Sequence, residues 1–293
     1  IPLLSSFACA IPGIMASRTI SDPRDRLTTI FVAPLMTCSA RLPVYALLIA
    51  AFIPEQTVWG IFNLQGLVLF ALYMAGIVSA LCVSFVLKFF HKDKSQHMLM
   101  MELPSYRFPD LKNIWIGLLD RAKIFLRRVG GIIFALSILL WFLCTFPQAP
   151  EGATLPEIDY SFAGMLGHLL QPIFAPLGFN WQICIALIPA MAAREVVVAA
   201  LGTVYALSAV DEDAMSQGLA SLISSGGELG WSVATGLSLL VWFIYAPHCL
   251  ATLATVKRET GSWKTVSFMT IYLFGLAYLM SFLTYQIATH YLG

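Results

Sequence analysis

The sequence predicts an all-α, polytopic membrane protein. Of its 293 residues, 59% are hydrophobic and only 11% are charged, and its mean hydropathy is +0.80. Long apolar segments recur along the chain, and Lys and Arg gather in a few of the connections between them. A soluble domain carries about 25% charged residues, and a soluble core of this size could not bury so much apolar surface. We therefore expect the lipid bilayer to be a partner of this chain and to surround much of its apolar surface.

The apolar segments fall into two kinds. Four are long enough to cross the roughly 30 Å hydrocarbon core as plain helices: residues 27–52, 59–87, 231–256 and 265–289. A fifth, residues 129–146, is shorter but uniformly apolar. Two others, residues 1–20 and 181–207, carry a proline near the middle with Arg18 or Arg194 after it. Such interrupted segments favour re-entrant or discontinuous helices.

The distribution of charge predicts the orientation. Three stretches, residues 18–26, 88–128 and 257–264, hold 15 of the 17 Lys and Arg residues. The other connections contain acids but no Lys or Arg, so the positive-inside rule places the basic stretches in the cytoplasm. One interrupted segment then enters from the cytoplasm and the other from outside. This pattern is typical of secondary transporters with inverted repeats.

We therefore divide the chain into three parts: a first gate repeat (1–95), a cytoplasmic linker (96–128) and a second gate repeat (129–293). In the linker, Asp110 can cap a helix whose apolar residues recur at helical spacing. That helix either lies at the membrane interface or packs on a cytoplasmic domain. The chain starts in mid-pattern without an initiator Met, so we expect it to be a piece of a longer protein.

Three prolines in apolar segments lie close to cysteines. A proline inside a helix leaves the carbonyl four residues earlier without its donor. The carbonyls expected to be free are those of Ala8, Ser39 and Ile185, next to Cys9, Cys38 and Cys184. Sulfur with carbonyl oxygen suits a borderline divalent cation, so Cys9 and Cys38 are candidate metal ligands, with Met15 and Met36 nearby. The alternative is that these cysteines and methionines only fill space in a core.

Several polar residues at membrane depth are candidates for an ion path. Arg41 follows Cys38 by three residues and would share its helix face. Arg194 and Glu195 either neutralise each other or line the path. His248, beside Cys249, is either part of a metal site or gate, or a structural histidine.

Other functions find no support in the sequence. It contains no P-loop for GTP or ATP, no H-E-x-x-H motif, and no cysteine spacing typical of haem or an iron–sulfur cluster. We therefore expect this chain itself not to be an enzyme. The net charge of +1 gives no indication of nucleic acid, and the six scattered cysteines are expected to be free thiols.

Five motifs resemble those of one family. Residues 6–20 (SFACAIPGIMASRTI) and 33–45 (APLMTCSARLPVY) are similar to the first gate motif of the ferrous iron transport protein B family. Residues 102–109 (ELPSYRFP) resemble its linker, and residues 188–197 (IPAMAAREVV) with 246–252 (APHCLAT) its second gate.

This resemblance implies uptake of Fe²⁺ across a bacterial cytoplasmic (inner) membrane, with gate cysteines matched by Cys9, Cys38 and Cys249. It also implies an N-terminal GTPase domain, which would bind GTP and Mg²⁺ and is absent from this chain. Small accessory proteins and a homo-oligomer are compatible with it.

Two other readings stay open at this point. A nucleoside-type or other solute symporter would need Asn, Gln, Ser and acids at the breaks, where this sequence offers sulfur. A non-transporting receptor or scaffold would not need Arg41, Arg194 and Glu195 at membrane depth.

Overall fold

The computed structural model describes residues 2–53, 57–58, 62–90, 110–147, 160–192, 194, 196–204, 232–247 and 249–292. The first half of the fold contains α1 (Pro2–Ser6), α2 (Ala10–Ala16), η1 (Ser17–Thr19), α3 (Pro23–Val32), η2 (Ala33–Leu35), η3 (Ser39–Arg41), α4 (Leu42–Phe52), the short strands β1 (Thr57–Val58) and β2 (Phe62–Asn63), and α5 (Leu64–Phe90). The second half contains α6 (Leu111–Thr145), α8 (Phe162–Phe174), η4 (Ala175–Leu177), α9 (Trp181–Ala192), α10 (Val196–Val204), α12 (Val233–Tyr245), α13 (Leu250–Thr260) and α14 (Trp263–Leu292).

The predicted all-α membrane fold is confirmed. Among the described residues, four helical stretches are long and apolar enough to cross a membrane: Pro23–Phe52, Leu64–Phe89, Val233–Thr260 and Trp263–Tyr291. They coincide with the four predicted spans. Local capping explains where several helices begin, because the side chains of Asp22, Asp110, Ser161 and Ser232 each accept a hydrogen bond from the first turn of the helix that follows.

Two of the four spans are not plain helices, which corrects the sequence prediction. The first is interrupted between α3 and α4 by two short 3₁₀ turns on either side of Cys38. The other is interrupted between α12 and α13, where Cys249 has an extended backbone. Prolines at the start of helical segments, such as Pro43 at the second position of α4, are tolerated because the first turn needs no backbone donor.

The second half of the chain holds a bent helix pair. The segment Phe162–Leu177 meets Trp181–Met191 at 104°, as expected for a broken span or a re-entrant loop. The sequence predicted a broken segment at residues 181–207 but assigned residues 147–180 to an external connection, so α8 was missed. The predicted linker helix and fifth span are one continuous helix, α6, which begins after Asp110 as expected.

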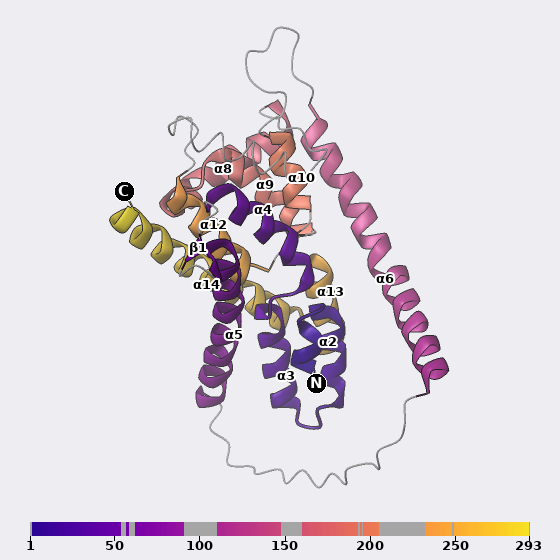
Figure 1. Cartoon of the computed structure of the whole chain (residues 1–293). Coiled ribbons are helices and arrows are strands. Elements are labelled where there is room, and N and C mark those ends of the chain that lie inside the picture. Colours follow the sequence, from indigo (N-terminus) through magenta and orange to yellow (C-terminus); the bar gives the residue numbers. More distant parts are fainter. Residues whose placement is uncertain are drawn as a thin grey trace.

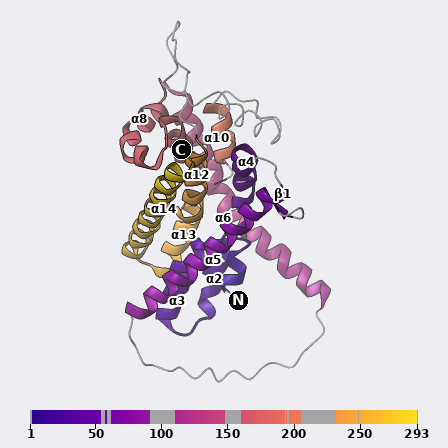
Figure 2. The same ribbon diagram turned by 60° about the vertical axis from the view of Figure 1, so that its left-hand side comes forward.

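The positions of two basic stretches agree with the orientation predicted from charge. Arg18 and Arg26, on the first basic stretch, both bind the Glu259 carboxylate on the last basic stretch, at 2.6 Å and 3.1 Å. Figures 1 and 2 show α2 and α3 at one end of the molecule and α8 and α10 at the other. Two stretches predicted to be cytoplasmic therefore lie on the same side.

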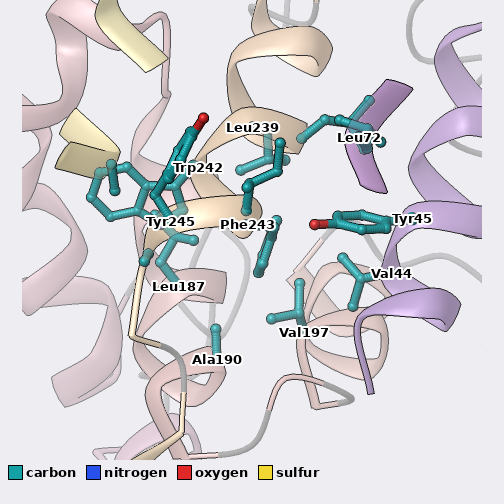
Figure 3. Close-up of a cluster of buried hydrophobic side chains, with 14 of the residues drawn as sticks. Val44, Tyr45, Leu72, Leu187, Ala190, Val197, Leu239, Trp242, Phe243 and Tyr245 are labelled. Atoms are coloured by element: carbon teal, nitrogen blue, oxygen red, sulfur yellow. The ribbon is translucent and has the colours of Figure 1, made fainter. Parts of the chain in front are cut away.

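The core joins the two halves of the chain. Residues of α4 and α5 pack with residues of α9, α10 and α12 in one buried cluster, part of which Figure 3 shows. Helices α12 and α14 run side by side along much of their length (Figure 2) and exchange hydrogen bonds between Ser238 and Ser281 in both directions. The helix breaks are thus held on packed helices from both halves of the chain.

Candidate functional site

Three cysteines occupy equivalent positions at helix breaks. Cys9 precedes α2, Cys38 precedes η3 and Cys249 precedes α13, each as the capping residue with an extended backbone. A side chain at this position usually accepts a hydrogen bond from the helix, but none of these three thiols does so. The three sulfur atoms are therefore not used to terminate their own helices.

Two of the thiols lie where α2 packs on α13. Helices α2 and α13 pack through Ile11 and Ala251, and Cys9, Met15 and Cys249 lie against that buried pair. The Cys38 break lies beside the Cys9 break, because Ser39 bonds to the carbonyl of Ala8. Sequence analysis placed these cysteines in separate motifs, and the structure brings them to one region.

Arg194 connects the break at Cys38 with the break that follows α12. Its Nη1 lies 3.5 Å from the Sγ of Cys38, and its Nη2 donates to the carbonyl of Ala246 at 3.4 Å. Arg194 is 7% exposed, so its guanidinium is buried beside the thiol of Cys38 and the carbonyl of Ala246.

Arg41 has a different role. It is 1% exposed, and its guanidinium donates to the carbonyls of Pro34 (2.9 Å), Leu35 and Met36 (both 3.3 Å). These groups end the 3₁₀ turn η2, so Arg41 satisfies carbonyls that lack a helical donor. Cys38 has an extended backbone, which contradicts the expectation that Cys38 and Arg41 share a helix face.

The carbonyls predicted to be free at two breaks are both occupied. Ser39 donates its hydroxyl to the carbonyl of Ala8 at 2.9 Å, which ties the Cys38 break to the Cys9 break. The carbonyl of Ser39 accepts from the backbone N–H of Leu42. Both carbonyls therefore stabilise the breaks, and the prediction that they are unpaired was wrong.

Unpaired polar atoms gather instead around the Cys38 segment. Thr37 Oγ1, Arg41 Nε and Tyr45 Oη are buried and have no hydrogen-bond partner among the residues that the structure describes. Each such group costs about 1–3 kcal/mol, so buried polar atoms are normally paired with protein or water. Figure 3 shows the Tyr45 hydroxyl directed toward Phe243. Three such atoms fall within the nine residues from Thr37 to Tyr45, which include the turn that follows Cys38.

The remaining predicted site residues lie in the hydrophobic core or outside the described residues. Met36 is 7% exposed and belongs to the hydrophobic core. Glu195 and His248 lie outside the described residues. Within the described part of the chain, no group of three His, Cys, Asp or Glu side chains is close enough to hold a metal ion.

Sequence reasoning missed several residues of this region. Ser39, Thr37 and Tyr45 carried no signal of their own, since their importance depends on contacts across the fold. Glu259 did carry one, because it is the only acid in the basic stretch 257–264.

The fold and the helix breaks at Cys9, Cys38 and Cys249 define the class of protein: a polytopic membrane protein with broken helices. A family model described as "Nucleoside recognition" matches residues 1–52 and 126–263. A second, described as "Ferrous iron transport protein B C terminus", matches residues 69–121.

Curated relatives agree with the second description. The chain is 40% identical over 299 residues to "Fe(2+) transporter FeoB" of Leptospira interrogans, covering 98% of this chain and 42% of the relative. It is 33% identical over 293 residues to the protein of the same name from Campylobacter jejuni, covering 98% and 46%. A "Fe(2+) transport protein A/Fe(2+) transporter FeoB fusion protein" of Porphyromonas gingivalis is 36% identical over 322 residues, covering 98% and 37%.

The chain belongs to the ferrous iron transport protein B family, as the motifs in the sequence indicated. It spans about two fifths of the length of these curated relatives. No solved structure matches it.

Proposed function

We propose that this chain is the permease region of a transporter that moves Fe²⁺ into the bacterial cytoplasm across the inner membrane. The contact between Arg194 Nη1 and Cys38 Sγ carries the proposal, because it joins the break of one repeat to the gate cysteine of the other. The names of the relatives support Fe²⁺ as the transported substrate.

The chemistry of the site supports a borderline divalent cation. Cys9, Cys38 and Cys249 would offer thiolate sulfur, and Met15 beside Cys9 and Cys249 would add a thioether. Among the described residues, no group of three His, Cys, Asp or Glu side chains is close enough to hold a metal ion, so the proposal includes an approach of the breaks to one another when an ion enters. Met36 in the core would act only by packing, and Glu195 and His248 remain candidates for the gate.

Arg194 would act as a tethered positive charge in the absence of the ion. Its guanidinium lies on the Cys38 thiol, where an entering cation would also bind. Two cations cannot share that position without strong repulsion in a medium of low dielectric constant. Entry of Fe²⁺ would therefore displace Arg194 and loosen its bond to Ala246 at the second break.

The longer parent protein would supply the energy. We expect its N-terminal GTPase domain to bind GTP and Mg²⁺ and to act through the linker at residues 96–128, between gate repeats at 1–95 and 129–293. The greater length of the relatives supports a further domain. The fused relative supports an accessory protein of the same transport system.

A nucleoside carrier is the second candidate, because one matching family model is described by nucleoside recognition. Its site would need amide and carboxylate groups to bind a base and a ribose. The described breaks instead present thiols and a guanidinium, so we favour the metal ion.

Uptake of radioactive Fe²⁺ by proteoliposomes of the full-length parent tests the proposal, with Mn²⁺, Zn²⁺ and a nucleoside as competitors. We expect Cys9→Ser and Cys38→Ser to lower uptake at least about tenfold, as losses around metal sites usually do. Cys82→Ser, on the exposed face of α5, is the matched control and should keep uptake. Equal uptake by all three variants, or competition by the nucleoside alone, would contradict the proposal.

A further inference from the structure

A groove on the outer surface of the bundle lies between α3, α5 and α14. It has a volume of about 350 Å³ and is lined by Phe31, Cys82, Val83, Val86, Leu87, Phe268, Tyr272 and Leu276. All of its exposed lining is apolar. Among the described lining residues only Tyr272 carries a hydroxyl, and this hydroxyl donates to the carbonyl of Phe31 at 2.5 Å, so it is not available to a ligand.

The groove opens sideways. Val86 and Phe268 on its rim are 49% and 58% exposed, and the Cys82 side chain is exposed as well. In a bilayer such an opening faces the acyl chains of lipids. A void between packed helices forfeits contacts on its walls, so an apolar chain of matching width is held there more favourably than in the bulk lipid.

The depth of the groove is set by the helices that form it. With a rise of 1.5 Å per residue, its lining residues lie about 5–20 Å from the ends of α5 and α14 that carry Lys88 and Lys264. The half-thickness of the hydrocarbon core is about 15 Å. The groove therefore lies in the leaflet on the basic side of the protein.

Two cations lie beyond its basic end. Lys264 is exposed one turn before Phe268, and residues four apart share a helix face. Arg24 is exposed two turns before Phe31 on α3, again on the same face. Both side chains can reach the head group of a lipid whose chain enters the groove. Lys88, by contrast, is about 170° around α5 from the lining face.

We propose that this groove binds one acyl chain of an anionic phospholipid, with the lipid phosphate on Lys264 and Arg24. Apolar walls select a hydrocarbon chain, and the two cations select a negative head group. The lipid would join α3 of the first repeat to α14 of the second. The inference requires only that the chain spans a membrane, so it does not depend on the identity of the transported ion.

Quenching of a fluorophore by nitroxide-labelled lipids tests this proposal in the full-length parent protein. The fluorophore is attached to Cys82 as the only cysteine, in nanodiscs that contain nitroxide-labelled phosphatidylglycerol or phosphatidylcholine. A matched reporter is placed at Leu81→Cys in a chain without Cys82, because Leu81 is 65% exposed on the same helix. We expect phosphatidylglycerol to quench the Cys82 reporter at lower mole fraction than phosphatidylcholine does, whereas the two lipids should quench the Leu81 reporter equally.

Charge variants test the head-group contact. Lys264→Gln should weaken the preference for phosphatidylglycerol about fivefold, as expected for one cation near a lipid head group. Lys88→Gln is the control on the opposite face of α5 and should leave it unchanged. Equal quenching at both reporters would mean that only bulk lipid contacts the groove. A lack of quenching at Cys82 would mean that another segment of the parent covers it, and a preference that survives Lys264→Gln would refute the head-group contact. Each of these three results would overturn the proposal.

Discussion

Gly76 allows α5 to approach the segment that carries Cys38. A Cβ atom at this position would lie 2.9 Å from Thr37 Oγ1 and 3.3 Å from the carbonyl oxygen of Leu35. Thr37 is 1% exposed and β-branched, so its side chain has little freedom to move away. We therefore expect Gly76→Ala to push α5 and the Cys38 break apart.

The expected change in the free energy of unfolding follows from two opposing effects. Adding a methyl group to a packed site costs about 1–3 kcal/mol, whereas replacing glycine by alanine inside a helix contributes about 1 kcal/mol. Gly76→Ala should therefore lower the free energy of unfolding by about 0–2 kcal/mol, and it should reduce Fe²⁺ uptake per folded transporter. Gly66→Ala, on the same helix and with no atom of the described residues within 4 Å of the added Cβ, should show only the favourable helix effect.

Thermal unfolding of the purified full-length protein, with uptake measured in parallel, provides the assay. Adding Thr37→Ala to Gly76→Ala removes Thr37 Oγ1, which the new methyl group would meet. The double variant should therefore recover part of the thermal stability and part of the uptake. If Gly76→Ala and Gly66→Ala behave alike, then close packing at Gly76 does not hold the Cys38 segment in place and the reasoning fails.

Three further predictions concern contacts away from the thiols. Gly236→Ala would place its Cβ 2.4 Å from the Phe52 ring, so it should destabilise the protein by about 1–3 kcal/mol, and adding Phe52→Leu should recover part of the loss in a denaturation assay. Glu259→Gln removes the buried carboxylate that two arginines share and should lower the thermal midpoint, whereas Asp25→Asn, an exposed acid on α3, should not; equal midpoints would reject a role for this ion pair. Leu118→Ala, at an exposed position of α6, should lower uptake per folded transporter while GTP hydrolysis by the proposed GTPase domain of the parent stays near normal, and unchanged uptake would reject a coupling role for the linker helix.

The spans could be predicted from sequence because burial in lipid imposes one simple requirement. Every backbone polar group must be satisfied within the segment, so a long apolar run becomes a helix. The side of the membrane on which the basic stretches lie could be predicted because Lys and Arg gather in cytoplasmic connections. The ion pairs from Arg18 and Arg26 to Glu259 agree with that prediction, since they join two of the basic stretches.

The breaks were harder to locate, because proline marks both the interior kink and the first turn of a helix. Pro12 and Pro43 belong to first turns, so the interruptions fall before them, at Cys9 and Cys38. The contact from Arg194 to Cys38 joins residues 156 positions apart, and periodicity within a segment holds no information about such a pair.

The central claim is that thiols from both repeats form one ion site. Its most direct test is the rate at which N-ethylmaleimide alkylates each cysteine of the full-length protein under anaerobic conditions, with and without Fe²⁺, followed by mass spectrometry. We predict that Fe²⁺ slows alkylation of Cys9, Cys38 and Cys249 together and leaves Cys82 unchanged. Unchanged rates at the three gate cysteines, or equal slowing at Cys82, would contradict the claim.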